Sequence, residues 1–232
     1  MSIEENINRI KRDLANNITL IAVSKTKPCE AIEEAYKNGC RDFGENKVQE
    51  LSEKIDMLPK DIKWHLIGHL QRNKVKYIAG KVHLIHSLDS IKLLEEIERQ
   101  YSSKDCIANT LIQINIGREN SKTGILIEDL EGLLKKCELC NNVKVKGLMA
   151  IIPIGPEEKC RAYFKEMKTI WNELRNKNFR NISMEYLSMG MTHDYKIAVE
   201  EGSNMVRVGT GIFGERNYTN IGGKENVCKD DK

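Results

Sequence analysis

The chain has 232 residues, of which 40% are hydrophobic and 31% are charged. With only 4 prolines and 16 glycines, the composition excludes disordered and collagen-like chains, and the length suits one α/β barrel or two small domains. The net charge of +3 argues against a nucleic-acid-binding protein. No apolar run approaches the roughly 18 residues of a membrane span. The charged N-terminus is unlike a signal peptide, so we expect a cytoplasmic protein without membrane partners.

Helix and strand patterns alternate along the chain. Apolar residues at helical spacing predict helices over residues 3–14, 30–38, 90–101, 128–140 and 157–175. Short β-branched and apolar runs predict eight strands, at residues 19–23, 41–43, 63–67, 82–87, 110–116, 145–152, 182–187 and 205–208. This alternation predicts an α/β fold with a parallel sheet: a single (β/α)8 TIM barrel with an extra N-terminal helix. A doubly wound open sheet is the alternative, since strand count does not exclude it.

We expect one domain over residues 1–216, because no linker rich in proline, glycine or serine divides the chain. The polar segment 217–232 is expected to be a disordered tail.

The first candidate for chemistry is Lys25, in the segment AVSKTKP at residues 22–28. Alternation along the predicted strand places Lys25 on the same face as Ile21 and Val23, toward the barrel interior and near its C-terminal end, where barrel enzymes hold their sites. Desolvation and a nearby cation such as Lys27 lower the pKa of a lysine from its usual value of about 10.4. Such a lysine suits a Schiff base, although an ordinary lysine at a strand end fits the same residues.

A second pattern indicates a phosphate site. The last predicted strand runs into the turn Gly209-Thr210-Gly211, and the preceding strand ends near Ser188. Glycines allow backbone N–H groups to approach a phosphate, and the loops after strands 7 and 8 of a barrel often bind one. Closure of the barrel would bring both strands beside the strand that carries Lys25.

Two further motifs leave alternatives open. Asn46 follows the second strand, where it can contact a ligand or cap the helical stretch that follows, and the residues alone favour capping. His65 and His69 are four residues apart but straddle a strand end, and no third ligand is evident. We therefore expect no metal site.

Together these motifs resemble the pyridoxal phosphate homeostasis protein family, whose members are barrels similar to the N-terminal domain of alanine racemase. The matching stretches lie at residues 22–28, 43–50, 64–74, 147–153, 187–194 and 206–214. The resemblance implies that Lys25 holds pyridoxal 5′-phosphate as an internal aldimine and that Arg207 approaches the pyridine nitrogen. Thr192 stands where a serine is usual in the family, and its hydroxyl is retained.

The resemblance also assigns the remaining contacts with the cofactor. It implies that Ser188, Gly209 and Thr210 bind the phosphate and that Asn46 and Met149 line the pocket. A guanidinium beside the pyridine nitrogen would leave the cofactor held but weakly activated for carbanion chemistry.

The expected function is homeostasis of the cofactor: binding, buffering and delivery to apo-forms of pyridoxal-phosphate-dependent enzymes, by a monomer that is not itself an enzyme and has no catalytic residues. The alternative is an amino-acid racemase of the same fold, which needs a second acid/base group opposite Lys25. A third possibility is a barrel that binds another phosphorylated metabolite without a covalent bond.

Overall fold

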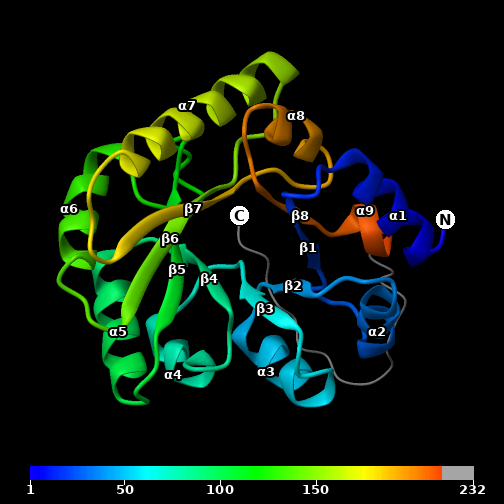
Figure 1. Ribbon diagram of the computed structural model, residues 1–232, viewed down its shortest axis with the longest axis horizontal. Coiled ribbons are helices and arrows are strands. Elements are labelled where there is room, and N and C mark those ends of the chain that lie inside the picture. The colour runs from blue at the N-terminus through cyan, green and yellow to red at the C-terminus, as the bar shows by residue number, and fades with distance from the viewer. Residues whose placement is uncertain (216–232) are drawn as a thin grey trace.

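Eight short parallel strands close into a barrel, in which each strand pairs with its neighbours in chain order and β1 pairs with β8 (Figure 1). This computed structural model describes residues 1–215, and the closed ring confirms the predicted barrel over the doubly wound alternative. The strands are β1 Thr19–Val23, β2 Asp42–Glu45, β3 Lys63–Leu66, β4 Leu84–Leu88, β5 Ala108–Ile114, β6 Val143–Ala150, β7 Ile182–Ser188 and β8 Met205–Val208. The predicted tail, 217–232, and residue 216 lie outside the described residues.

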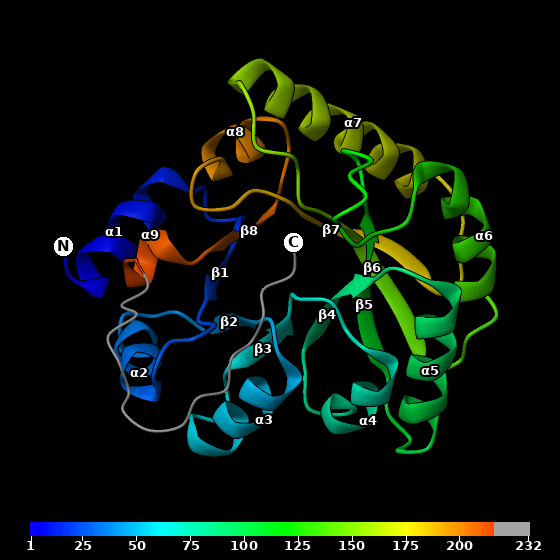
Figure 2. The ribbon, with the colours of Figure 1, turned by 180° about the vertical axis from the view of Figure 1, so that it is seen from behind.

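The helices surround the ring of strands, as both views show (Figures 1 and 2). Their bounds are α1 Ile3–Asp13, α2 Cys29–Lys37, α3 Val48–Met57, α4 Val75–Ile78, α5 Ile91–Ser102, α6 Ile127–Cys137, α7 Glu157–Arg175, α8 Tyr195–Glu200 and α9 Thr210–Phe213, with a 3-10 turn η1 at Arg72–Lys74. No helix within residues 1–215 combines the length and apolarity needed to cross a bilayer.

The extra N-terminal helix covers the outside of the barrel where α9 is too short to do so. α1 begins with a capping box in which Ser2 and Glu5 exchange hydrogen bonds. The amide of Asn6, on the buried face of α1, donates to the carbonyl of Ile212 at 3.0 Å. The Tyr195 hydroxyl donates to Asp13 at 2.7 Å and joins α1 to α8. α1 therefore fills the place of a full-length eighth outer helix.

Two apolar regions lie on opposite sides of the strands. The larger one fills the space between the sheet and the helices. The smaller one lies inside the barrel and consists of Ile21, Leu84, Leu111, Met149 and Met205. Because alternate residues of a strand point to opposite sides, the interior also receives polar side chains from the same strands.

Most predicted elements lie within a few residues of their observed bounds, and the differences have physical causes. β2 continues through Gly44 to Glu45, although glycine disfavours a strand interior. A Cβ at Gly44 would lie 2.9 Å from Ile21 and 3.1 Å from Ile67, so the crowded barrel interior selects glycine there. The four-residue helices α4 and α9 are too short to give a periodic sequence signal.

A substitution at Gly147 tests how closely the strands of the barrel are packed. Its φ of +147° and the register shift between β6 and β7 leave a Cβ only 1.8 Å from the carbonyl oxygen of Tyr186. We expect Gly147→Ala to lower the free energy of unfolding by about 3 kcal/mol, measured by urea denaturation. The matched control is Gly132→Ala in α6, where a Cβ meets nothing within 4 Å and stability should rise by about 1 kcal/mol. Equal effects of the two substitutions would contradict this account.

Candidate functional site

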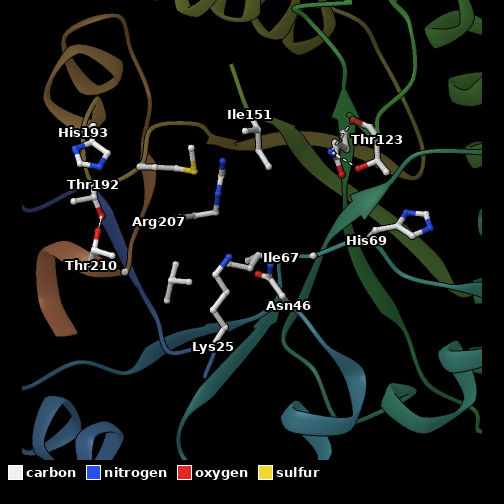
Figure 3. Close-up of a pocket in the computed structure, with 15 residues that line it drawn as sticks. Lys25, Asn46, Ile67, His69, Thr123, Ile151, Thr192, His193, Arg207 and Thr210 are labelled. Carbon is white, nitrogen blue, oxygen red and sulfur yellow. Dashed lines mark hydrogen bonds between the residues drawn. The ribbon is translucent and has the colours of Figure 1, made fainter. Parts of the chain in front are cut away.

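A cavity of about 400 Å³ opens at the C-terminal ends of the strands, the end of the barrel where such folds hold their ligands. Lys25 and Arg207 extend into it from β1 and β8, and Asn46, Thr192 and Thr210 lie around them (Figure 3). The structure thus brings five positions of the predicted site together: Lys25, Asn46, Arg207, Gly209 and Thr210.

Lys25 is half-buried and sits in a turn that the neighbouring helix fixes. Thr26 has a φ of +63°, a strained value for a β-branched residue. Its backbone N–H donates to Glu50 of α3 at 2.6 Å. The carbonyl of Ser24, on the other side of Lys25, accepts a bond of 2.9 Å from Lys54. The residues before and after Lys25 are therefore both attached to α3.

A buried ionic cluster of Glu45, Glu50 and Lys54 supports this turn. The Lys54 ammonium donates to Glu45 at 2.8 Å and to Glu50 at 2.6 Å, and its side chain is only 7% exposed. The Ser24 hydroxyl donates to the same oxygen of Glu45 at 2.6 Å. Burial raises the pKa of Glu45, although Lys54 and Ser24 act in the opposite direction. The carboxylate therefore depends on Lys54 for its charge.

Arg207 supplies the cavity with a buried positive charge. It is 3% exposed, and its guanidinium donates to the Ser188 hydroxyl at 2.5 Å and to the Ala150 carbonyl at 2.9 Å. Burial lowers the pKa of Arg207 to about 10, with the Asp194 carboxylate acting in the opposite direction. The group stays charged at neutral pH and its remaining N–H donors are available to a ligand in the cavity.

Hydroxyl groups gather on the side of the cavity formed by the loops after β7 and β8. The Thr210 hydroxyl lies 3.2 Å from that of Thr192, and the backbone N–H of Gly211 donates to Thr192 at 3.3 Å. Asp194 accepts from the N–H of Met191 at 2.5 Å and holds the loop that carries Thr192. Neutral hydroxyls and backbone donors at this place suit a phosphate group.

Asn46 faces the cavity and does not cap α3, whose N-cap residue is Lys47 without a side-chain cap bond. The capping interpretation of Asn46 is therefore wrong. The close approach of the loop after β3 explains its position, because a Cβ at Gly68 would lie 2.5 Å from the carbonyl oxygen of Asn46. Only a glycine allows the two loops to meet there.

Two predicted positions do not reach the cavity wall. Ser188 is fully buried, and its hydroxyl is engaged by Arg207 and by His86 at 3.2 Å. Met149 packs in the apolar interior with Ile21 and neighbouring residues. Both lie on strands rather than on the following loops, so they are deeper in the barrel. Thr192, noted in the sequence only as a departure from the family, takes the place at the cavity that Ser188 was expected to fill.

The titratable groups around the cavity are few. His69 and His193 lie at its opposite edges, on either side of Lys25 and Arg207 (Figure 3). His69 is half-exposed and lies 3.0 Å from the Asp89 carboxylate. Among the described residues that line the cavity there is no aspartate or glutamate. Residues 1–215 also contain no group of three side chains placed to hold a metal ion.

The fold and the site define a class: (β/α)8 barrels with a lysine just after the first strand and a cluster of hydroxyl and backbone N–H groups after the last two strands. The alanine racemase N-terminal domain family matches residues 1–217. A pyridoxal phosphate homeostasis protein of Aquifex aeolicus is 43% identical over 205 residues, 88% of this chain and 89% of that protein. The homologue of the same name from Escherichia coli is 38% identical over 87% of both chains.

Solved structures agree with this assignment. PipY of Synechococcus elongatus, solved with bound PLP, is 35% identical and covers 92% of this chain and 100% of its own at a TM-score of 0.85. Alanine racemase of Clostridium difficile shares the fold at a TM-score of 0.73 but only 14% identity, and the match covers 57% of that longer chain. The chain belongs to the pyridoxal phosphate homeostasis protein family.

Lys54→Met tests the ionic cluster behind Lys25. The change leaves the Glu45 carboxylate buried without its ammonium partner, so we expect a loss of about 3 kcal/mol in the free energy of unfolding at pH 7.5. Because the pKa of Glu45 in the folded state is raised above its ordinary value of 4.5, protonation favours the folded protein and the penalty grows as pH rises through the folded pKa. Denaturation at a series of pH values should therefore show a smaller loss at pH 5.

Lys135→Met is the matched control for this experiment. Lys135 pairs with Glu131 at 2.7 Å on the exposed surface of α6, where loss of an ion pair has little effect on stability. Two results would contradict the account of Glu45 as a buried carboxylate that depends on Lys54. One is a loss of unfolding free energy in Lys54→Met that does not change with pH, and the other is an equal loss in Lys135→Met.

Proposed function

We propose that the protein binds pyridoxal 5′-phosphate covalently at Lys25 and serves in the intracellular homeostasis of this cofactor. The observation that supports this proposal most directly is that the predicted binding groups line one cavity. There the amine of Lys25, the guanidinium of Arg207 and the hydroxyls of Thr192 and Thr210 surround one space without a carboxylate among the described lining residues. The bound PLP of the related PipY supports the choice of ligand.

Each side chain has a part in the proposed binding. The Lys25 amine would form the covalent bond with the cofactor aldehyde, with loss of water. Thr192, Thr210 and Gly209 would hold the phosphate, Arg207 would donate to the pyridine nitrogen, and Asn46 would line the ring. In other proteins this cofactor acts as an electron sink for carbanions. A guanidinium cannot accept a hydrogen bond and carries a positive charge, so it would favour an unprotonated ring nitrogen, which weakens that capacity.

We infer a carrier rather than a racemase. Racemisation needs acid/base groups on both faces of the reacting carbon. The described histidines of the cavity lie at its edges, and Arg207 is the group that faces Lys25 (Figure 3). The names of the relatives support the same choice, since they refer to homeostasis of the cofactor. The similarity to alanine racemases is a similarity of fold.

The proposed partners are apo-forms of pyridoxal-phosphate-dependent enzymes, to which a monomeric carrier would deliver the cofactor. The proposed location is the cytoplasm, where the six described cysteines, all free, would stay reduced.

Lys25→Arg tests the covalent bond, because arginine retains the positive charge without a primary amine. After incubation with pyridoxal 5′-phosphate and borohydride reduction, the intact mass of the wild-type protein should gain one cofactor, and peptide mapping should place it on Lys25. The variant should gain none. Lys47→Ala, which removes an exposed lysine at the same end of the barrel, should behave like the wild type. An unmodified wild-type protein would contradict the proposal.

Thr192→Ala tests the phosphate side of the cavity. Loss of one hydrogen bond to an anion should raise the dissociation constant for pyridoxal 5′-phosphate about tenfold. Binding of pyridoxal, which lacks the phosphate, should not change, and absorbance titration measures both ligands. An equal loss of affinity for pyridoxal 5′-phosphate and for pyridoxal would show that Thr192 does not contact the phosphate.

A further inference from the structure

The barrel interior contains a continuous row of polar side chains that crosses it from one end to the other, and all of them are buried except the first, which is partly exposed. We call it the interior chain, and its members are Asp42, His65, His86, Ser188 and Arg207. Successive members are joined by contacts of 3.0, 3.0, 3.2 and 2.5 Å, beginning at Asp42. Asp42 is the first residue of β2, at the N-terminal end of the barrel, whereas Arg207 lines the cavity at the other end.

The two ends of the interior chain fix its direction. A guanidinium can only donate hydrogen bonds, and an ionised carboxylate can only accept them. The Arg207 N–H therefore donates to Ser188, which leaves the Ser188 hydroxyl hydrogen for Nδ1 of His86. The Nε2–H of His86 then donates to Nδ1 of His65, and the Nε2–H of His65 donates to Asp42. In this arrangement both imidazoles are neutral and every donor has an acceptor.

The opposite arrangement places a second cation in the barrel interior. If His65 were an imidazolium, its Nδ1–H would donate to His86, and His86 would donate to Ser188. The Ser188 hydroxyl would then have no acceptor within the interior chain. In addition, the barrel interior would hold a second positive charge besides that of Arg207. Burial, with the Arg207 cation acting in the same direction, holds the pKa of His86 well below its ordinary value. The packing therefore favours the neutral arrangement.

The titratable groups around the interior chain are consistent with hydrogen bonds that are donated in sequence from Arg207 toward Asp42. The His83 ring packs against His65 at 5.4 Å between centroids, and burial lowers the pKa of His83. Burial acts to raise the pKa of Asp42, but the hydrogen bond from His65 and the charge of Lys63 act in the opposite direction, and the pKa lies below its usual value. Asp194 acts on Arg207 through space from the loop after β7. Asp42 is therefore the carboxylate to which the chain of hydrogen bonds leads.

We propose that the interior chain is a one-directional relay of hydrogen bonds that orients the Arg207 guanidinium, with Asp42 as its remote counter-ion and with His86 and Ser188 as positioning residues. The inference rests on the proposed function in one respect, since Arg207 is the group directed at the cofactor ring. It assigns Ser188 to the support of Arg207 rather than to the phosphate, because its hydroxyl already accepts from Arg207 and donates to His86.

Histidine tautomers test the direction in the cofactor-free protein. Long-range 1H–15N correlation spectra at pH 7, assigned with His65→Gln and His86→Gln, should show both rings neutral with the proton on Nε2. A proton on Nδ1 of His86, or a charged His65, would overturn the relay. This measurement needs neither bound cofactor nor an altered interior in the protein under test.

Ser188→Ala tests the positioning role, and Ser87→Ala is its matched control. Ser87 is also fully buried and follows His86 on β4, but its hydroxyl has no hydrogen-bond partner among the described residues. We expect Ser188→Ala to raise the dissociation constants of pyridoxal 5′-phosphate and of pyridoxal by the same factor, about tenfold, because the effect acts on the ring. Ser87→Ala should change neither.

Comparison of the dissociation constants for pyridoxal 5′-phosphate and for pyridoxal distinguishes the possible roles of Ser188. A loss confined to the phosphorylated ligand would make Ser188 a phosphate contact and overturn its positioning role. Unchanged affinities in Ser188→Ala would also overturn it. If the wild-type protein takes up neither ligand, the proposed function fails, while the histidine tautomers still decide the direction of the relay.

Discussion

Pairing of the first strand with the last is the constraint on which the rest of this structure depends. β1 and β8 lie side by side with Ile21 opposite Arg207, and Lys25 follows four residues later at the end of β1. Closure therefore places an amine and a guanidinium from opposite ends of the chain in one cavity. An open sheet would leave β1 and β8 at separate edges, and neither side chain would have its present surroundings.

The closed barrel must then accommodate polar groups in its interior. Apolar side chains such as Met149 fill part of it, and the interior chain from Asp42 to Arg207 fills another part. Burial of polar groups is costly unless each has a partner. Here the partners come from five different strands, so the hydrogen bonds form only in the closed fold. The same requirement explains why the Ser188 hydroxyl has hydrogen-bond partners on both sides, Arg207 and His86, within the protein itself.

A second buried network acts from outside the barrel. Glu45, Glu50 and Lys54 lie between β2 and α3, and they hold the backbone on both sides of Lys25. The strained conformation of Thr26 persists because its N–H has a carboxylate acceptor. Two separate networks thus support the two side chains Lys25 and Arg207 of the cavity, one network for each. Both use ionised groups whose partners are fixed by the fold, which suits a protein that holds its ligand in one orientation.

The sequence by itself determined the alternation of strands and helices, the barrel, and the place of Lys25, Gly209 and Thr210. These features depend on local periodicity and on residues at strand ends, which a single segment displays. The strand position of Gly44 was not predicted, because the crowding that selects glycine there comes from distant segments. Helix α9 was not predicted because its four residues are too short to show a helical period. The residues around Asn46 favour a helix cap, whereas the family resemblance places Asn46 at the pocket. The structure agrees with the resemblance, and the close approach of Gly68 gives the physical reason.

The tertiary structure alone decided which hydroxyl lines the cavity. Ser188 and Thr192 are four residues apart and chemically alike, but Ser188 lies on β7 within the barrel and Thr192 lies on the loop above it. Their separation depends on where β7 ends relative to its neighbours. The partnership of His65 with His86 and Asp42 was equally hidden, because hydrogen bonds between strands far apart in sequence exist only after the barrel closes.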